Sequence, residues 1–500
     1  MPIRKDIKSM KIKLIAPARK PEWGESFWDL KTLCKLTGRK AGGAPLALPT
    51  LAALTPSDVE VVLTDENVEP INFEENVDFV GITGMTCVIP RSYEIADEFR
   101  KRGVPVVMGG IHVSMIPEEA IQHCDCVVIG EAEEIWEQLV RDTQKNNLQK
   151  FYQAPRFPDL TNAPMPRWDL LKNDKYCYFT IQTGRGCPYD CEFCSVQTFN
   201  GRQYRYKSID CVLKEITFLK GLETKKPFFF VDDNILAVKD YAKELFNKLV
   251  FLNIKWWCQS SVDGLKDNEI LDLMYKSGCR EIFVGFESIL QSSLNSLHKS
   301  KINMVDEYKD IINTVHSHGI AIFGSFILGS DNDNPDIFEH TGKFINDTNI
   351  SFAMINILTP PPGTKLYSRL KAENRLITYE WHKYDGEHTS FKPNLMSQIQ
   401  LQKKRLVLLK NIYSYRCLYN RLKNIWDIGV FVRDKKNRKL FTKGRLLFTL
   451  RTIFDNKFNR KFFILKSLWN KNITSIMSVL LAINFREYAY QNRLNDNVPI

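Results

Sequence analysis

The first 145 residues alternate short runs of aliphatic and β-branched residues with stretches of helical periodicity. Strands are predicted at 12–18, 59–67, 77–86, 104–114 and 126–134. Between them, 89–103 and 116–124 place apolar residues three and four positions apart, as amphipathic helices do. Strands that alternate with helices predict a parallel sheet with crossover helices. We therefore predict a doubly wound, Rossmann-like α/β domain over residues 1–150, with ligands bound beyond the carboxyl ends of its strands.

A second alternation follows a proline-containing stretch at 151–175, which has four prolines and no periodicity and is predicted to be a linker. Strands are predicted at 178–186, 227–233, 255–261, 281–288, 321–329 and 352–360. Six β/α repeats over 176–365 predict an open (β/α)6 barrel whose loops at the strand carboxyl ends form one active site. From 366 to 500 the pattern becomes helical and basic, which predicts a mostly helical C-terminal domain.

Charge is distributed unevenly along the chain. The formal net charge is +11, but residues 401–500 contain 22 Lys+Arg against 5 Asp+Glu, so the remainder is slightly acidic. Such a segment suits an anionic membrane surface, an anionic substrate, nucleic acid or simply a solvated helical face. It contains no zinc-finger, recognition-helix or RNA-binding signature, so we expect no nucleic-acid partner and favour an anionic membrane surface.

The remaining bulk properties indicate a cytoplasmic protein, peripheral at the membrane if the basic segment binds there. Charges interrupt every apolar run near the start, which excludes a signal-peptide core, and no run of about 18 uncharged apolar residues occurs. In a reducing compartment the twelve cysteines are not a disulfide framework. A close cysteine cluster is then expected to bind metal or to be catalytic.

One such cluster occurs in "GRGCPYDCEFCSVQ", directly after the first barrel strand. Cys187, Cys191 and Cys194 have the spacing C-x3-C-x2-C. Structural zinc takes four ligands in two separated pairs, and no second pair follows. Three thiolates on a [4Fe–4S] cubane would instead leave one iron open to a substrate or cofactor. The spacing therefore favours a catalytic iron–sulfur cluster.

The motif resembles the signature of the radical S-adenosylmethionine (SAM) family, with Phe193 as its aromatic residue. The resemblance implies that Cys187, Cys191 and Cys194 bind a [4Fe–4S] cluster whose fourth iron chelates SAM. Reductive cleavage of SAM would then give a 5′-deoxyadenosyl radical that removes hydrogen from an unreactive carbon. The electron would come from a donor such as flavodoxin or ferredoxin.

The resemblance extends to polar residues and glycines at the barrel strand ends. These candidates for contacting SAM, each of which could also be an ordinary strand end, are Asp232, Asp233, Asn234, Ser260, Glu287, Ser288 and Gly324. Glu287 and Ser288 match the segment that contacts the ribose, and Gly324 matches the segment beside adenine. An aspartate pair at a strand end could also cap the next helix.

A doubly wound domain ahead of this barrel is similar to the cobalamin-binding radical SAM enzymes. The resemblance implies cobalamin between the two domains, near Gly109, Gly110, His112 and Glu131, although the D-x-H-x-x-G motif that supplies an axial histidine is absent. His112 is therefore expected near the corrin or its tail, not as a cobalt ligand. A structural role for this histidine is the alternative.

Stretches such as "GRQYRYKS", "FFVDDN" and "TPPPGTKLYSRL" resemble the hopanoid C-2 methyltransferase group. The resemblance implies cobalamin-dependent methyl transfer to an unactivated carbon of a lipid-like or other small-molecule substrate. No catalytic side chain is assigned, because the two cofactors carry the chemistry. Tyr384, Asp385 and His388 are candidates for orienting a head group or for packing a loop. The alternatives are a cyclase similar to the anaerobic magnesium-protoporphyrin monomethyl ester cyclase and, outside enzymes, an iron–sulfur regulator that binds nucleic acid.

Overall fold

The N-terminal domain is built on a six-stranded sheet in which every strand is parallel to its neighbours. The structure, a computed structural model, describes residues 10–427. The strand order is β2-β1-β3-β4-β5-β6. The strands are β1 (Lys11–Ala16), β2 (Glu60–Asp65), β3 (Phe79–Thr83), β4 (Val106–Gly109), β5 (Cys126–Ile129) and β6 (Phe151–Gln153). Strand β6 extends the sheet into the segment predicted as a linker.

Helices cover both faces of this sheet, which confirms the predicted doubly wound fold. On one face, α3 (Ile89–Lys101), α4 (Ile111–Met115) and α5 (Pro117–Ala120) lie over a core that includes Val80 and Met108. On the other face, α2 (Ala47–Leu54) and α6 (Trp136–Gln144) pack on a core that includes Leu14 and Phe79. A short helix, α1 (Lys31–Thr37), follows β1 and reaches the barrel core through Leu33.

The second sheet is the predicted open barrel of six parallel strands, in the order β14-β13-β12-β11-β10-β7. Its strands are β7 (Phe179–Ile181), β10 (Phe228–Phe230), β11 (Trp256–Ser260), β12 (Cys279–Glu287), β13 (Ala321–Leu328) and β14 (Phe352–Ile357). The helices that alternate with them are α8 (Ile209–Leu222), α9 (Lys239–Leu249), α10 (Asn268–Ser277), α11 (Gln291–Ser296), α12 (Tyr308–Ser317) and α13 (Ile337–Asp347). A separate two-stranded antiparallel sheet joins β8 (Gly184–Arg185) to β9 (Arg205–Tyr206).

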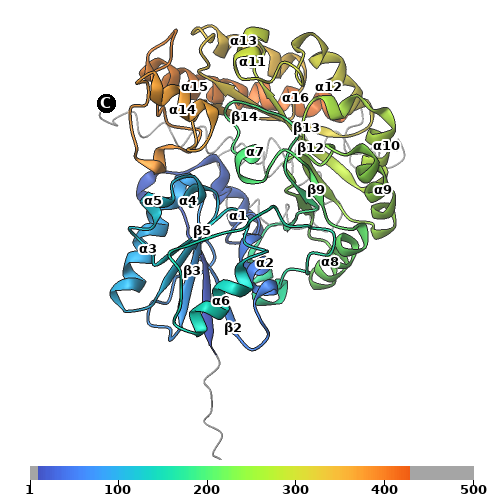
Figure 1. Cartoon of the computed structure of the whole chain (residues 1–500). Helices are drawn as coiled ribbons and strands as arrows, with labels where there is room; N and C mark the ends of the chain where they lie inside the picture. Colours follow the sequence, from blue (N-terminus) through green and yellow to red (C-terminus); the bar gives the residue numbers. More distant parts are fainter. Residues whose placement is uncertain (1–9, 428–500) are drawn as a thin grey trace, which may run out of the picture.

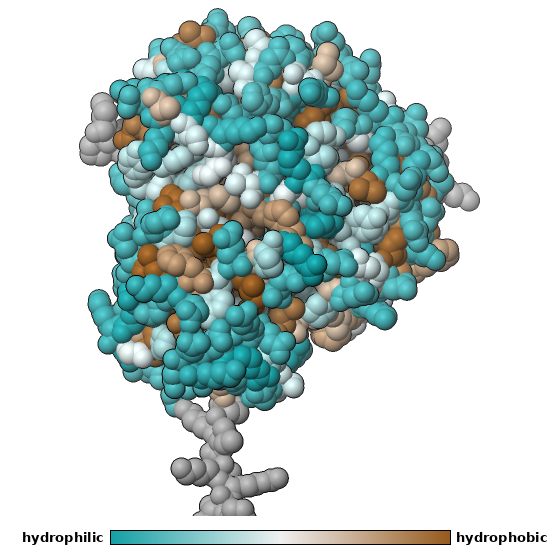
Figure 2. Space-filling view, viewed as in Figure 1, coloured by the Kyte–Doolittle hydropathy of each residue, from teal (hydrophilic) through white to brown (hydrophobic). Residues whose placement is uncertain are grey.

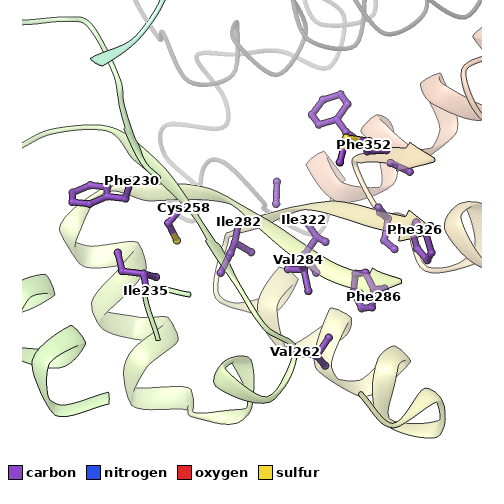
Figure 3. Close-up of a cluster of buried hydrophobic side chains, with 14 of the residues drawn as sticks. Phe230, Ile235, Cys258, Val262, Ile282, Val284, Phe286, Ile322, Phe326 and Phe352 are labelled. Atoms are coloured by element: carbon purple, nitrogen blue, oxygen red, sulfur yellow. The ribbon is translucent and has the colours of Figure 1, made fainter. Parts of the chain in front are cut away.

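The two faces of the barrel sheet differ in burial. Side chains toward the helices, among them Phe230, Cys258 and Ile282, are fully buried and form the core drawn in Figure 3. Strand register places a second set on the inner face, and these side chains are only half-buried: Tyr178, Phe229, Trp257, Phe283 and Phe323. The barrel therefore presents aromatic rings toward its interior.

After the last strand the chain is helical, as predicted, with α14 (Lys365–Ala372), α15 (Gln398–Ile412) and α16 (Tyr415–Asp427). Helix α15 begins with a capping box at Ser397 and Gln400 and packs against α13 and β14. No helix within residues 10–427 is both long and apolar enough to cross a membrane. Most of the basic segment noted in the sequence lies outside the described residues.

The carboxyl ends of the first sheet point toward the barrel. In Figure 1, α4 and α5, which follow β4, lie at the top of the N-terminal domain, and α7 (Val196–Phe199) lies in the gap above them. Figure 2 shows apolar residues along the band where the two domains meet, between more hydrophilic surfaces. The loops expected to carry function in each domain thus face the same junction.

Candidate functional site

The three clustered cysteines lie in the loop between β8 and α7, at the carboxyl end of the first barrel strand. The pairing of β8 with β9 closes this loop at its base. Gly186 has a positive φ of 95°, and a Cβ there would overlap the carbonyl of Gln203, so only glycine fits. The N–H of Cys187 donates to the carbonyl of Gly201 (3.3 Å). The thiols are therefore presented from one ordered loop.

Burial of this loop disfavours ionisation of the three thiols while no group is bound to them. Burial raises the pKa of Cys187 to about 11, that of Cys194 to about 12, and that of Cys191 as well. The charge of Cys191 raises the pKa values of Cys187 and Cys194 further, whereas the ammonium of Lys299 lowers that of Cys191. Binding to iron removes the thiol proton outright. The donor set thus suits an iron–sulfur cluster.

A site for a single metal ion is a poorer description of this loop. Among the residues described, no three His, Cys, Asp or Glu side chains converge closely enough to hold one ion. In a cubane cluster each thiolate binds a different iron, so the ligand sulfurs do not meet at one point. The arrangement of the three cysteines is compatible with a cubane cluster.

Asp232, expected to contact SAM, instead anchors the cysteine loop. Its side chain is fully buried and accepts hydrogen bonds from Thr183 Oγ1 (2.7 Å), the Thr183 N–H (3.0 Å) and Tyr204 OH (2.8 Å). Asp233 Oδ2 accepts from the N–H of Gly186 (3.1 Å), directly before Cys187. Burial raises the pKa of Asp233 to about 6. The aspartate pair therefore tethers the loop to the end of β10.

Next to the aspartate pair, polar side chains from the ends of β10 and β11 form a buried network. Asn234 donates to Ser261 Oγ (3.0 Å) and accepts from Ser260 Oγ (3.3 Å). Tyr189, within the cysteine loop, donates to Asp263 Oδ2, while Asp263 Oδ1 is buried without a hydrogen-bond partner. An orphaned buried carboxylate oxygen calls for a donor such as an amine or hydroxyl of a ligand. Tyr189 and Asp263 were missed in the sequence, where only their closeness to a cysteine and to a strand end marks them.

Glu287 ends β12 in a left-handed conformation with φ of 61°. Its carboxylate forms a buried ion pair with Lys299 (2.6 Å), and Lys299 Nζ also lies 5.9 Å from the centre of the Phe193 ring. Burial alone would lower the pKa of Lys299, but the charges of Glu287 and Cys191 raise it. Lys299 therefore brings a permanent positive charge beside the cysteines. The sequence analysis missed it because it lies 12 residues beyond Glu287.

The last two barrel candidates have local structural roles. Ser288 Oγ accepts from the N–H of Leu290 (3.1 Å), so it caps the turn after β12. Gly324 lies on the helix-covered face, where a Cβ would be 3.0 Å from Phe326 and 3.3 Å from Phe286. Close packing thus explains this glycine, and the expected approach to adenine is not needed to account for it.

In the N-terminal domain, Gly109 and Gly110 connect β4 to α4 at the domain junction. Gly110 has a φ of 105°, and a Cβ there would be 2.7 Å from Thr83 Oγ1. His112 is buried, with Nδ1 3.3 Å from Thr86 Oγ1 and Nε2 3.5 Å from Glu119 Oε1. Both ring nitrogens are engaged by the protein, which favours the structural role that the sequence left open.

Glu131 joins the two domains at the ends of their sheets. It follows β5, and its carboxylate pairs with Arg185 (2.8 Å) and with Arg205, while Asn200 Nδ2 donates to it (3.1 Å). Arg185 also pairs with Glu133. Because Asn200 caps α7, these contacts tie the segment after the cysteines to the carboxyl end of β5.

The loop that contains Tyr384, Asp385 and His388 is held by the protein. Asp385 accepts from Arg19 Nη2 (2.9 Å) and from His388 Nδ1 (3.0 Å), and Tyr384 OH donates to the Thr378 carbonyl (2.7 Å). Burial opposes the charge of Asp385, but the His388 and Arg19 partners lower its pKa. These contacts support loop packing, the second of the two roles considered for the three residues.

Comparison with known families divides the chain as its fold does. Residues 39–140 match the B12 binding domain, and residues 181–345 match the Radical SAM superfamily. Residues 364–492 match a domain of unknown function. The structure also resembles that of the radical S-adenosylmethionine methyltransferase TsrM from Kitasatospora setae, with a TM-score of 0.61, 15% identity, and coverage of 80% of this chain and 89% of that one. At that identity, the resemblance supports the fold.

Several relatives with higher sequence identity are methyltransferases. The chain is 31% identical to bacteriochlorophyllide d C-12(1)-methyltransferase of Chlorobaculum tepidum, over 79% of this chain and 89% of the relative. It is 33% identical to the C-8(2)-methyltransferase of the same organism, over 75% and 88%. Hopanoid C-2 methylase of Rhodopseudomonas palustris is 29% identical, over 67% and 65%. The chain therefore belongs to the cobalamin-binding radical SAM methyltransferases, enzymes that use a [4Fe–4S] cluster, SAM and cobalamin.

Proposed function

We propose that this enzyme transfers a methyl group to an unactivated carbon of a large, apolar, ring-containing small molecule. The observation that carries the proposal is the junction at Glu131, which ties the segment after the cysteine loop to the carboxyl end of β5. When bound, the cluster and cobalamin supply the electron that cleaves SAM and the methyl group that is transferred. The chain must then hold both cofactors and the substrate in one water-excluded site.

Cys187, Cys191 and Cys194 are the proposed cluster ligands. Their burial suppresses ionisation of the free thiols, and Lys299 provides a nearby positive charge that favours a negatively charged cluster. Asp232 and Asp233 hold the loop from below by accepting hydrogen bonds from Thr183 and Gly186.

For SAM, we propose the polar groups at the ends of β10, β11 and β12. Asp263 Oδ1 has no partner among the described residues and is suited to an ammonium or hydroxyl group. Asn234 and Ser260 would line the same pocket, while Glu287 and Ser288 lie at the end of the next strand. Asp232 is assigned to loop anchoring because the protein already supplies its donors.

For cobalamin, we propose the loops after β3, β4 and β5 at the domain junction. Gly109 and Gly110 leave the backbone open to close approach there, although Gly110 also makes room for Thr83. His112 is not proposed as a cobalt ligand, because its ring contacts Thr86 and Glu119. Glu131 is proposed to fix the position of the N-terminal domain relative to the barrel.

The proposed substrate class rests on the inner face of the barrel. Tyr178 and Trp257 lie with ring centres 4.9 Å apart, and Phe229 stacks on Trp257 with ring centres 5.4 Å apart. These half-buried rings can pack on a flat apolar ring system. Burial raises the pKa of Glu281 on the same face to about 8, so this carboxyl is uncharged near pH 7. The named substrates of the relatives, bacteriochlorophyllides and hopanoids, are of this class.

Product analysis under anaerobic conditions tests the reaction type. The full-length protein is reconstituted with iron and sulfide, then given cobalamin, SAM and a strong reductant. We expect both 5′-deoxyadenosine and S-adenosylhomocysteine by mass spectrometry, the second only when cobalamin is present. Formation of deoxyadenosine alone would favour a cyclase-type reaction. If neither product forms, both the methyltransferase and the cyclase-type reaction are contradicted. In vivo, the electron requires a donor, for which we propose a flavodoxin or ferredoxin.

We further propose that this cytoplasmic enzyme rests on an anionic membrane surface through α15 and the basic segment after it. Between residues 388 and 426 the chain has eight Lys or Arg and no Asp or Glu; six of the eight are at least partly exposed, whereas Arg405 and Arg421 are buried. Ile399 and Val407 are 41% and 55% exposed on α15, and Leu395 is 54% exposed just before it. Exposed apolar side chains among basic residues suit a lipid surface, where each Lys or Arg contributes about 1 kcal/mol.

Vesicle co-sedimentation checks this second proposal. The full-length protein should pellet with phosphatidylglycerol vesicles, stay in solution with phosphatidylcholine vesicles, and be released by salt. Val407→Glu should reduce binding, whereas Leu222→Glu, at a similarly exposed apolar position on α8, should not. Equal recovery with both lipids, or none with either, would rule out electrostatic membrane binding.

A further inference from the structure

Helix α14, which follows the barrel in the chain, contacts the cysteine loop. The carbonyl of Glu192 accepts from the N–H of Leu366 (3.0 Å), and Lys365 pairs with Asp190 (2.6 Å). Both Asp190 and Glu192 stand next to Cys191 in the chain. The helix therefore contacts the loop on either side of a proposed cluster ligand.

A further contact is a partly buried two-point ion pair. Arg369 Nε donates to Glu192 Oε1 (2.6 Å) and Nη2 donates to Oε2 (3.0 Å), while the Glu192 side chain is 7% exposed. Arg369 Nη1 also donates to Asp331 (2.8 Å), which Arg375 contacts from its other side (2.6 Å). Parallel hydrogen bonds from a guanidinium fix orientation as well as distance. Glu192 is thus held rigidly between Cys191 and Cys194.

The other side of α14 meets the N-terminal domain. Gly363, just before the helix, has a φ of 80°, and a Cβ there would overlap Met115 of α4. Tyr367 packs against the core formed by α3 and its face of the first sheet. One helix of two turns thereby contacts both the cysteine loop and the domain that matches the B12 binding family.

We propose that Arg369 is a positioning residue which, through Glu192, sets the place of the cluster relative to SAM and the N-terminal domain. This inference rests on the proposed function of the three cysteines. Arg369 touches no reacting atom. Its role is to keep the cysteine loop in the geometry in which electron transfer to SAM is productive, since small displacements at a reacting centre cost large factors in rate.

The test compares Arg369→Gln with Arg375→Gln in the full-length reconstituted protein. Arg375 shares Asp331 with Arg369 but does not contact Glu192, so it controls for loss of a charge in the same network. We expect Arg369→Gln to retain iron and sulfide, to alter the electron paramagnetic resonance spectrum of the reduced cluster with SAM, and to form deoxyadenosine roughly tenfold more slowly. Arg375→Gln should stay within about twofold of wild type.

Three further variants keep the test decisive. Arg369→Lys should recover part of the rate of deoxyadenosine formation, and Glu192→Gln should match Arg369→Gln. The double variant Arg369→Gln/Glu192→Gln should be no slower than either single variant. If Arg369→Gln fails to fold, wild-type behaviour of both Arg369→Lys and Glu192→Gln overturns the proposal. Arg369→Gln indistinguishable from Arg375→Gln overturns it directly. Absence of deoxyadenosine from wild type would instead count against the proposed function.

Discussion

At the end of β12, local geometry explains why residue 285 is glycine and how Glu287 is held. Glu287 adopts a left-handed backbone conformation, which costs on the order of 1–3 kcal/mol for a residue other than glycine. Its buried ion pair with Lys299 helps to offset that cost. Gly285 lies beneath the pair, and a Cβ there would overlap Glu287 Oε1 and lie 3.0 Å from Lys299 Nζ. The glycine makes room for the charges beside the cysteines.

Substitution of this glycine should therefore disturb the site without unfolding the barrel. We expect Gly285→Ala to displace the Glu287–Lys299 pair and to slow deoxyadenosine formation by about tenfold, with iron content unchanged. Gly221→Ala is the control, since nothing lies within 4 Å of a Cβ there and alanine favours the helix. Equal deoxyadenosine rates for the two variants would show that the space above Gly285 is not required.

At the scale of elements, periodicity predicted the strands of both large sheets and most of the helices. The helices are readable because each buries one face, and the strands of the first sheet are readable because they are continuous aliphatic and β-branched runs buried on both faces. Periodicity missed β6 and β9, and its single strand at 178–186 is divided in the structure into β7 and β8. The helical character after residue 365 was also predicted, but the pattern gave no sign that α14 would reach the cysteine loop.

The candidate site was predictable where one loop supplies all of it and less so where distant segments meet. The C-x3-C-x2-C spacing is local, so the cysteines could be proposed as cluster ligands from the sequence alone. Lys299 and Arg369 reach the loop only through the fold, and nothing near them in the chain marks them. For Asp232 and His112 the position was informative but the role was not, because hydrogen-bond partners such as Thr183 and Glu119 depend on tertiary contacts.

In the whole molecule, the proposed cofactor sites are brought together by the arrangement of the two domains. The carboxyl ends of both sheets face one junction, where Glu131 pairs with Arg185 and Arg205. The segment after β1 also reaches the barrel, with Phe27 6.1 Å from Phe323 on the inner face. These contacts bring the segment that carries the cysteines and the B12-binding-type domain to the same junction. We propose that both cofactors bind there.

The most direct test is electron paramagnetic resonance of the full-length protein loaded with both cob(II)alamin and the reduced cluster. Two paramagnetic centres in one site broaden or split each other's signals. We predict that reduction of the cluster perturbs the cobalt signal in wild type, and that Cys191→Ala, which should lose the cluster, leaves that signal unperturbed. If the cobalt signal of fully loaded wild-type protein does not change when the cluster is reduced, the cluster and cobalamin do not share one site.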